Sequence, residues 1–346
     1  MHMADALISP VVGGTLWAVT AGLASYSAKK MGKDLDDAKV PLMGVLGAFV
    51  FATQMINFTI PGTGSSGHLG GGLILAILLG PYAGFLTMAS ILTIQALFFA
   101  DGGLLALGCN IFNMGFFGCF VAYPLYKRIV GDAPTQGKLL AGAGIASIIG
   151  LQLGAFGVVL ETLFSGISEL PFSTFVLLMQ PIHLGIGIGE GLITTAVILF
   201  IWRERPEILK KEPYSIAKGS INLKRIVVRM AIATILISSV VSWFASTNPD
   251  GLEWSIAKTS NQEELAAPEG IHSVLADWQK KIAILPDYNF KEAAEAASSS
   301  AKGEEAAAWP AVSGGTSFAG LVGSALTLLL AGVIGKSLKM AATKRS

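Results

Sequence analysis

The sequence predicts an all-α polytopic membrane protein. Of its 346 residues, 52% are hydrophobic and only 14% are charged, against roughly 25% charged residues in soluble domains. Apolar runs of about 20 residues, the length of helix that crosses ~30 Å of hydrocarbon, recur along the chain. Because a helix satisfies its backbone hydrogen bonds internally, such runs can cross lipid. We therefore expect a multi-pass helical bundle.

Long apolar runs occur in both halves of the chain. The predicted long spans are Val11–Ala28, Val40–Phe58, Gly84–Ala100, Leu104–Tyr126, Leu139–Leu160, Phe172–Trp202, Ile226–Ala245 and Thr316–Leu338. A shorter ninth span is predicted at His68–Leu79, because Gly80-Pro81 should separate it from the next span. Whether this short span exists determines the side of the membrane on which every later loop lies.

The basic residues indicate the orientation of the spans. If the N-terminus is outside, every lysine and arginine apart from those in segment 246–313 falls in a short inner loop, an inner linker or the C-terminal tail. The short outer segments contain none. Since lysine and arginine in short loops favour the cytoplasmic side, we expect an extracytoplasmic N-terminus and a cytoplasmic C-terminus.

The composition divides the chain into two modules. Residues 1–203 form a seven-span module, residues 204–223 a basic cytoplasmic linker, and residues 224–346 a two-span module. The two-span module carries a hydrophilic, acidic insert at 246–313, which we expect to be extracytoplasmic and partly helical. Small residues at helical spacing, as at Gly14, Ala18 and Gly22, suit either packing within the bundle or docking of another membrane subunit.

Several familiar motifs are missing or lie in the wrong context. The run from Gly62 to Gly67 fits GxGxxG but follows a membrane span rather than a strand, and no P-loop, HExxH or GxSxG occurs. Cys109 and Cys119 lie ten residues apart in apolar stretches, as expected of packing residues. The start MHMADALISP has neither a basic n-region nor a cleavage site, so the first residues are expected to remain on the mature protein.

His2 follows the chain's α-amine and can form a chelate with it. The amine of Met1, the amide nitrogen of His2 and its Nδ1 would form two fused rings that present three nitrogens in one plane. Planar nitrogen coordination is preferred by Ni(II) and Cu(II). A bulky second residue should also protect Met1 from removal. The alternative is that His2 is only a polar residue at a frayed terminus.

His68 is a candidate fourth ligand. It ends the polar stretch INFTIPGTGSSG and begins the short glycine-rich span, where glycines allow close approach of the backbone to a ligand. A histidine at this position could also only cap a membrane helix. Because polar residues at membrane depth are costly and usually functional, we favour the role of ligand.

The remaining candidates concern the surroundings of the site. His183 and Glu190, seven residues apart in QPIHLGIGIGEG, should share one helix face, either supporting the metal-bound histidines or stabilising the bundle. His272 is expected at the surface of the insert. Amide side chains near the outer span ends either orient the histidines or satisfy helix ends; they are Asn57, Asn110 and Asn113.

Four segments together resemble the CbiM/NikM family, the substrate-capturing component of energy-coupling-factor importers for cobalt and nickel. The segments are MHMAD at the start, NFTIPGTGSSGHLGGG, ALGCNIFNMG and HLGIGIGEG. The second module, with NPDGLEWSIAKT after a span, resembles the small CbiN/NikN partner, here fused to the first. The resemblance covers most of the chain apart from the linker and the Ala/Glu-rich stretch.

The resemblance implies a seven-helix capture bundle in a prokaryotic inner membrane, with two further helices flanking the insert. It implies Met1, His2 and His68 as ligands of the transported ion, and nickel is preferred over cobalt on coordination grounds. It also implies a membrane coupling subunit (T or Q) and cytoplasmic ATPase subunits (A or O). No other cofactor, no enzymatic activity and no nucleic-acid partner is expected. The alternatives are a self-sufficient metal channel or secondary carrier and, less favoured, an intramembrane metalloenzyme.

Overall fold

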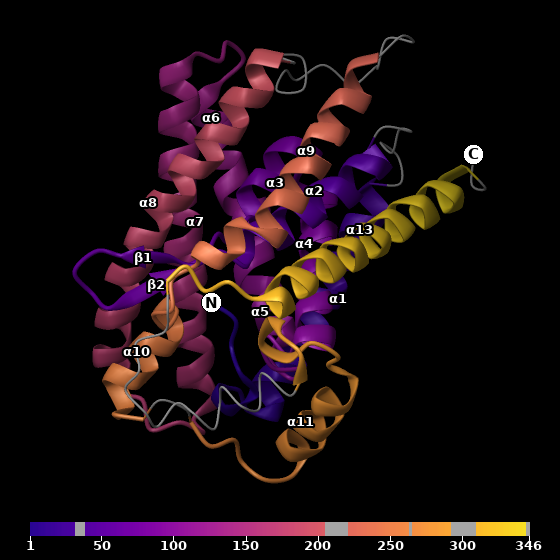
Figure 1. Cartoon of the computed structure of the whole chain (residues 1–346). Coiled ribbons are helices and arrows are strands. Elements are labelled where there is room, and N and C mark those ends of the chain that lie inside the picture. Colours follow the sequence, from indigo (N-terminus) through magenta and orange to yellow (C-terminus); the bar gives the residue numbers. More distant parts are fainter. Residues whose placement is uncertain (32–38, 205–220, 263–264, 292–308, 344–346) are drawn as a thin grey trace.

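The protein is a bundle of helices with one short hairpin, as the computed structural model in Figure 1 shows. The structure describes residues 1–31, 39–204, 221–262, 265–291 and 309–343. Its first module contains η1 (Asp5–Leu7), α1 (Pro10–Met31), α2 (Lys39–Gln54), β1 (Phe58–Ile60), β2 (Ser65–Gly67), α3 (Gly72–Leu79), α4 (Pro81–Phe99), α5 (Leu107–Ile111), η2 (Phe112–Ala122), α6 (Tyr123–Val130), α7 (Gln136–Ser165) and α8 (Phe172–Glu204). Its second contains α9 (Ile221–Ser239), η4 (Val241–Phe244), α10 (Gly251–Ser260), α11 (Ile271–Ile282), η5 (Pro286–Tyr288) and α13 (Gly314–Thr343).

The helices correspond to the predicted spans, and the multi-pass all-α fold is confirmed. Among the described residues, four helices are long and apolar enough to cross a membrane by themselves: α4, α7, α8 and α13. The predicted span Leu104–Tyr126 is a continuous helical run of α5, η2 and α6, in which η2 is a π-helix. The predicted break is also confirmed, because Gly80 has a φ of 85° between α3 and α4.

The start of the short span was predicted too early. Helix α3 begins at Gly72, so His68 lies in the loop that follows strand β2 rather than on a helix. The two strands form an antiparallel hairpin in which Phe58 pairs with Gly67. Gly71 adopts a left-handed conformation with a φ of 79°, which glycine tolerates without a steric penalty.

The two modules pack directly against each other. Helix α13 runs along α2, and a Cβ atom on Gly44 of α2 would lie only 3.0 Å from the carbonyl oxygen of Leu328. The small residues of α2 therefore pack within the bundle. Gly14 and Gly22 of α1 differ, since a Cβ atom on either would meet no described residue within 4 Å.

The insert is folded onto the bundle where the structure describes it. In Figure 1, α10 lies directly below the β1–β2 hairpin and α11 lies at the lower edge of the molecule. The predicted helical content of the insert is thus confirmed for this part. The linker 205–220 and the Ala/Glu-rich stretch 292–308 lie outside the described residues. The folded part of the insert covers the bundle end that contains the N-terminal segment.

Close backbone contact between η2 and α3 supports the loop that carries His68. A Cβ atom on Gly118 would lie 2.8 Å from the Cα atom of Gly72, so Gly118→Ala forces the two elements apart. We expect a loss of about 1–3 kcal/mol of stability, measured as thermal unfolding of the metal-free protein in detergent. Gly14→Ala is the matched control, since its Cβ meets open space and the helix should gain up to ~1 kcal/mol. Equal melting temperatures for the two variants would contradict this packing.

Candidate metal centre

The first residues of the chain are anchored inside the end of the bundle. The Asn110 side chain accepts a hydrogen bond from the Met3 amide at 2.8 Å and donates one to the Met3 carbonyl at 3.2 Å. Asp5 accepts from the amide of Ala106 at 2.9 Å. Met1 is 6% exposed and Met3 is fully buried. The N-terminus is therefore held in place and is not a frayed end.

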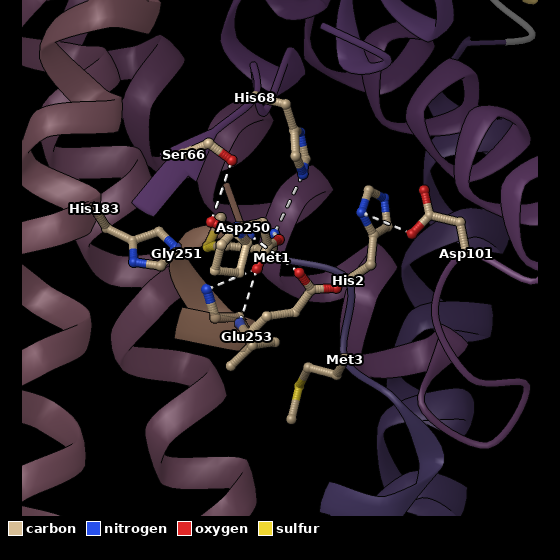
Figure 2. Close-up of polar contacts among 12 residues, drawn as sticks. Met1, His2, Met3, Ser66, His68, Asp101, His183, Asp250, Gly251 and Glu253 are labelled. Atoms are coloured by element: carbon tan, nitrogen blue, oxygen red, sulfur yellow. Dashed lines mark hydrogen bonds and ion pairs between the residues drawn. The ribbon is translucent and has the colours of Figure 1, made fainter. Parts of the chain in front are cut away.

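The amine of Met1 meets the imidazole of His68. Its nitrogen lies 3.3 Å from Nε2 of His68, as Figure 2 shows. The other ring nitrogen, Nδ1, lies 2.9 Å from the carbonyl oxygen of Leu69. Because a carbonyl can only accept, Nδ1 is the protonated position and Nε2 directs its lone pair at the amine. This is the tautomer in which Nε2 of a histidine can bind a metal ion.

The ring of His2 stacks on His68 but points away from the amine. The ring centroids are 5.0 Å apart with an interplanar angle of 22°. Nδ1 of His2 lies 3.3 Å from an oxygen of Asp101, and Nε2 lies 3.2 Å from Oε1 of Gln95. The structure thus brings together the amine and the His68 nitrogen, whereas the predicted planar chelate needs a rotation of the His2 ring. In the described part of the chain, no three His, Cys, Asp or Glu side chains already surround a single point as metal ligands.

A carboxylate from the second module completes the surroundings of the amine. Asp250 lies 3.0 Å from the Met1 nitrogen and also caps α10, where it forms a capping box with Glu253. The segment before it is attached to the hairpin, since Ser66 donates from its amide to the carbonyl of Pro249 at 2.8 Å. Sequence reasoning did not assign Asp250 to the site. The spacing Asp-x-x-Glu could have identified the helix cap, but nothing in it indicates an amine at the far end of the chain.

Two further residues near His2 were also missed. Asp101 follows α4 and accepts a hydrogen bond from the hydroxyl of Tyr288 at 2.5 Å. Gln95 donates to Gln54, which in turn donates to the carbonyl of Gly70 at 2.9 Å. Side chains from two helices, Gln95 of α4 and Gln54 of α2, therefore connect His2 to the loop that carries His68. These contacts position the two histidine rings relative to each other.

His183 and Glu190 lie on one face of α8, as predicted, and both face the loop after His68. Glu190 accepts hydrogen bonds from the amides of Gly70 at 2.8 Å and Gly71 at 3.2 Å. His183 is fully buried and borders a cavity of about 10 Å³, roughly the space of one water molecule. The cavity is lined by Met1, Gly67, His68, Gly70, Met114, Leu151, His183, Ile186, Asp250 and Gly251.

The other candidates have different places. Asn113 donates to Glu161 at 2.7 Å and lies 3.9 Å from the Met3 sulfur, so it supports the N-terminal segment. Asn57 contacts the insert through its backbone carbonyl, which accepts a hydrogen bond from the amide of Ser246. The predicted surface position of His272 is wrong: it is 3% exposed, and its Nε2 lies 2.8 Å from the carbonyl oxygen of Ile8. It was misjudged because the insert folds onto the N-terminal segment.

The electrostatics favour neutral imidazoles beside a charged amine. Burial, followed by the nearby ammonium of Met1, lowers the pKa of both His2 and His68 to about 3. Burial acts to raise the pKa of Asp250, but the Met1 ammonium and the hydrogen bonds that the carboxylate accepts act together with the other nearby groups to hold that pKa well below its usual range. At neutral pH both rings therefore keep a free lone pair, and the amine keeps a carboxylate partner.

Comparison with known proteins agrees with this fold and shows the family. Residues 2–208 match the model of the cobalt uptake substrate-specific transmembrane region, CbiM. The chain belongs to this family. Residues 224–340 match the PDGLE domain, and the run PDGLE itself begins at Pro249 and includes Asp250. This member therefore carries a fused NikN-like module.

Individual relatives are also transport proteins. The chain is 35% identical over 224 residues to the fused nickel transport protein NikMN of Rhodobacter capsulatus, covering 60% of this chain and 64% of that one. It is 28% identical to the cobalt transport protein CbiM of Geobacter sulfurreducens, covering 78% and 79%. A crystal structure of a transition metal transporter is 31% identical, with a TM-score of 0.53, and covers 62% of this chain and 98% of that one. This family member is thus a multi-pass metal transport protein and not an enzyme.

Acid should destabilise the metal-free protein through its buried histidines. An unfolded histidine takes up a proton below about pH 6.5, whereas His68 stays neutral in the fold down to about pH 3. The contribution of the neutral histidine to the free energy of unfolding should therefore be fully present above pH 6.5 and decrease as the pH falls toward 3. At pH 5 the loss is on the order of 2 kcal/mol per histidine, measured by thermal unfolding at pH 7 and pH 5. His68→Gln should show a smaller loss, and an unchanged loss would contradict the assigned neutral state.

The ion pair between Asp250 and the amine can be tested apart from the helix cap. Asparagine caps helices about as well as aspartate, so Asp250→Asn removes the charge and keeps α10. We expect a loss of about 3 kcal/mol in the metal-free protein, since the ammonium loses its buried partner. Asp250→Ala should lose about 1 kcal/mol more because the cap is also removed. Thermal unfolding in detergent measures both, and wild-type stability of Asp250→Asn would refute the pairing.

Proposed function

We propose that the chain is the substrate-capturing component of an energy-coupling-factor importer and that it binds Ni(II), with Co(II) as the second choice, at the extracytoplasmic face. The observation that carries this proposal is the buried amine of Met1 beside the unprotonated Nε2 of His68 at 3.3 Å. An ordinary chain terminus is exposed and mobile. A terminus enclosed with an imidazole lone pair suits capture of a cation that prefers nitrogen ligands.

Four nitrogens would hold the transported ion. They are the amine of Met1, the backbone amide nitrogen of His2, Nδ1 of His2 and Nε2 of His68. Forming the chelate requires that His2 turn its Nδ1 from Asp101 toward the amine, and that the amine and the amide release their protons. The planar set favours Ni(II), because deprotonated amide nitrogen in a square is a strong ligand for that ion.

The carboxylate of Asp250 would balance the positive charge of the loaded site. A divalent ion bound to one deprotonated amide has a net charge of +1, and Asp250 supplies one negative charge beside it. Before loading, the same carboxylate neutralises the ammonium. Buried charges need such a partner. Asp250 can therefore stabilise both the empty and the loaded site, which would make the second module part of capture.

The orientation and the partners complete the proposal. The basic residues near the ends of α1, α6 and α8 indicate that those ends are cytoplasmic, so the hairpin and the insert are extracytoplasmic. The sequence has no P-loop, which fits ATP hydrolysis in separate cytoplasmic subunits joined through a membrane coupling subunit. We also propose the division into residues 1–203, a linker at 204–223, and the module 224–346 that docks on α2 through α9 and α13.

Blocking the amine tests the proposed capture most directly. Adding one residue before Met1 leaves every side chain intact but removes the terminal chelate, so Ni(II) affinity should fall by at least 100-fold in equilibrium dialysis, about 3 kcal/mol. His2→Ala should have the same effect for the loss of Nδ1. A one-residue extension at the C-terminus is the matched control and should bind Ni(II) normally. Normal binding by the N-terminally extended protein would refute the proposed chelate.

Transport by the isolated chain separates the proposal from a channel or secondary carrier. Liposomes that contain only this chain should retain a nickel-sensitive dye signal no different from empty liposomes, because the proposed import requires ATPase subunits. The His2→Ala protein serves as the control for leakage through the bundle. Nickel entry that depends on His2 in liposomes without ATPase subunits would show a self-sufficient transporter instead.

A further inference from the structure

Helix α11 of the insert docks where two membrane helices have their ends. Nε2 of His272 lies 2.8 Å from the carbonyl oxygen of Ile8, just before α1 begins. The side chain of Gln279 donates a hydrogen bond to the carbonyl of Ala96, near the end of α4, at 2.9 Å. Because α4 is long and apolar enough to cross a membrane, its end marks the depth at which the hydrocarbon gives way to headgroups. Helix α11 therefore lies at that depth.

The chain stays at this depth after α11. The amide of Leu285 donates to the carbonyl of Phe98, at the end of α4, at 3.1 Å. The ring of Phe290 then stacks on that of Phe318, close to the start of α13, with the ring centroids 5.6 Å apart. Since α13 is also long and apolar enough to cross a membrane, its start marks the same boundary. Two membrane helices thus agree on the level of this part of the insert.

Helix α11 has an apolar face that the bundle does not cover. Ile271, Val274 and Trp278 recur at spacings of three and four residues, so their side chains lie on one side of the helix. They are 48%, 55% and 62% exposed. Ser273 and Ala276 are exposed on another side. Large apolar side chains gathered on one exposed face indicate an interaction surface.

The chemistry of this face suits the phospholipid headgroup region. Tryptophan is enriched at the boundary between membrane and water, where its ring contacts the apolar side and its N–H the polar side. Lys280 and Lys281 lie in the last turn of α11, and lysines beside an apolar helix face attract anionic lipids. At the depth of the span ends, headgroups surround the bundle. Phospholipid is therefore the partner that both the position and the charge of α11 favour.

We propose that α11 is an interfacial helix and that Ile271, Val274 and Trp278 enter the headgroup region of the bilayer. The membrane then holds the insert against the first residues of the chain, because the same helix contacts Ile8 through His272. The contact with lipid gives the second module an anchor besides α9 and α13. The inference does not depend on which ion the protein binds or on the proposed chelate.

Spin labels on the full-length protein test the proposal in nanodiscs of phosphatidylcholine and phosphatidylglycerol. One label is attached at Val274→Cys, one at Trp278→Cys and, as the matched control on the polar side, one at Ala276→Cys. The unsubstituted chain gives the background, since Cys109 and Cys119 are fully buried. Electron paramagnetic resonance then measures collisions of each label with oxygen, which concentrates in lipid, and with a neutral gadolinium chelate, which stays in water.

We expect the ratio of oxygen collisions to chelate collisions to be severalfold higher at Val274→Cys and Trp278→Cys than at Ala276→Cys. Equal ratios at the three positions would mean that the apolar face lies in water, and would overturn the proposal. Few collisions with either reagent at 274 and 278 would mean that protein covers the face, such as a second copy of the chain. That result would overturn the proposal as well.

A second measurement uses the wild-type protein, in case a labelled variant does not fold. The nanodiscs then contain a phospholipid with a diazirine next to its headgroup, which cross-links to neighbouring side chains on irradiation. Peptide mass spectrometry should find cross-links in the peptide that contains Val274 and Trp278. The start of α13 around Phe318 is the internal control, because it lies at the same depth. Cross-links there but none in α11 would overturn the proposal.

Discussion

The burial of a chain terminus between an imidazole and a carboxylate is the constraint on which the rest of the site depends. An ammonium removed from water must be compensated, and here Asp250 at 3.0 Å provides the charge while His68 provides a lone pair at 3.3 Å. The amine can exist in the interior only if both elements are in place. This links three segments, the first residues, the hairpin loop and the start of α10, in one cooperative unit.

The boundary between the two modules along the chain is not a boundary in space. The second module supplies the counter-charge of Met1 through Asp250, the hydroxyl partner of Asp101 through Tyr288, and a histidine contact to Ile8. Its last helix lies along α2. Fusion of the two modules in one chain thus places the residues of the insert next to the site without the entropy cost of bringing two proteins together. The insert forms one side of the candidate metal centre.

Glycine and amide side chains let backbone segments approach closely around the histidines. Gly70 and Gly71 direct their amides at the buried carboxylate of Glu190, and Gly118 crosses over Gly72 at backbone contact. Asn110 pairs with both polar groups of Met3, as a neighbouring strand would do. Because hydrogen-bond partners for irregular backbone are scarce within a membrane bundle, these side chains make a non-helical loop and an inward-folded terminus possible at this depth.

The sequence by itself determined the elements that depend on local pattern: the apolar spans, the break at Gly80-Pro81, the shared face of His183 and Glu190, and the histidines that could act as ligands. Hydrophobic length, proline geometry and helical spacing act over a few residues, so they can be read from a single chain. Only the tertiary structure placed Asp250 on the amine, turned Nδ1 of His2 to Asp101, and buried His272. Those positions arise from contacts between residues far apart in the chain, decided by how the insert folds across the bundle, and no local periodicity encodes them.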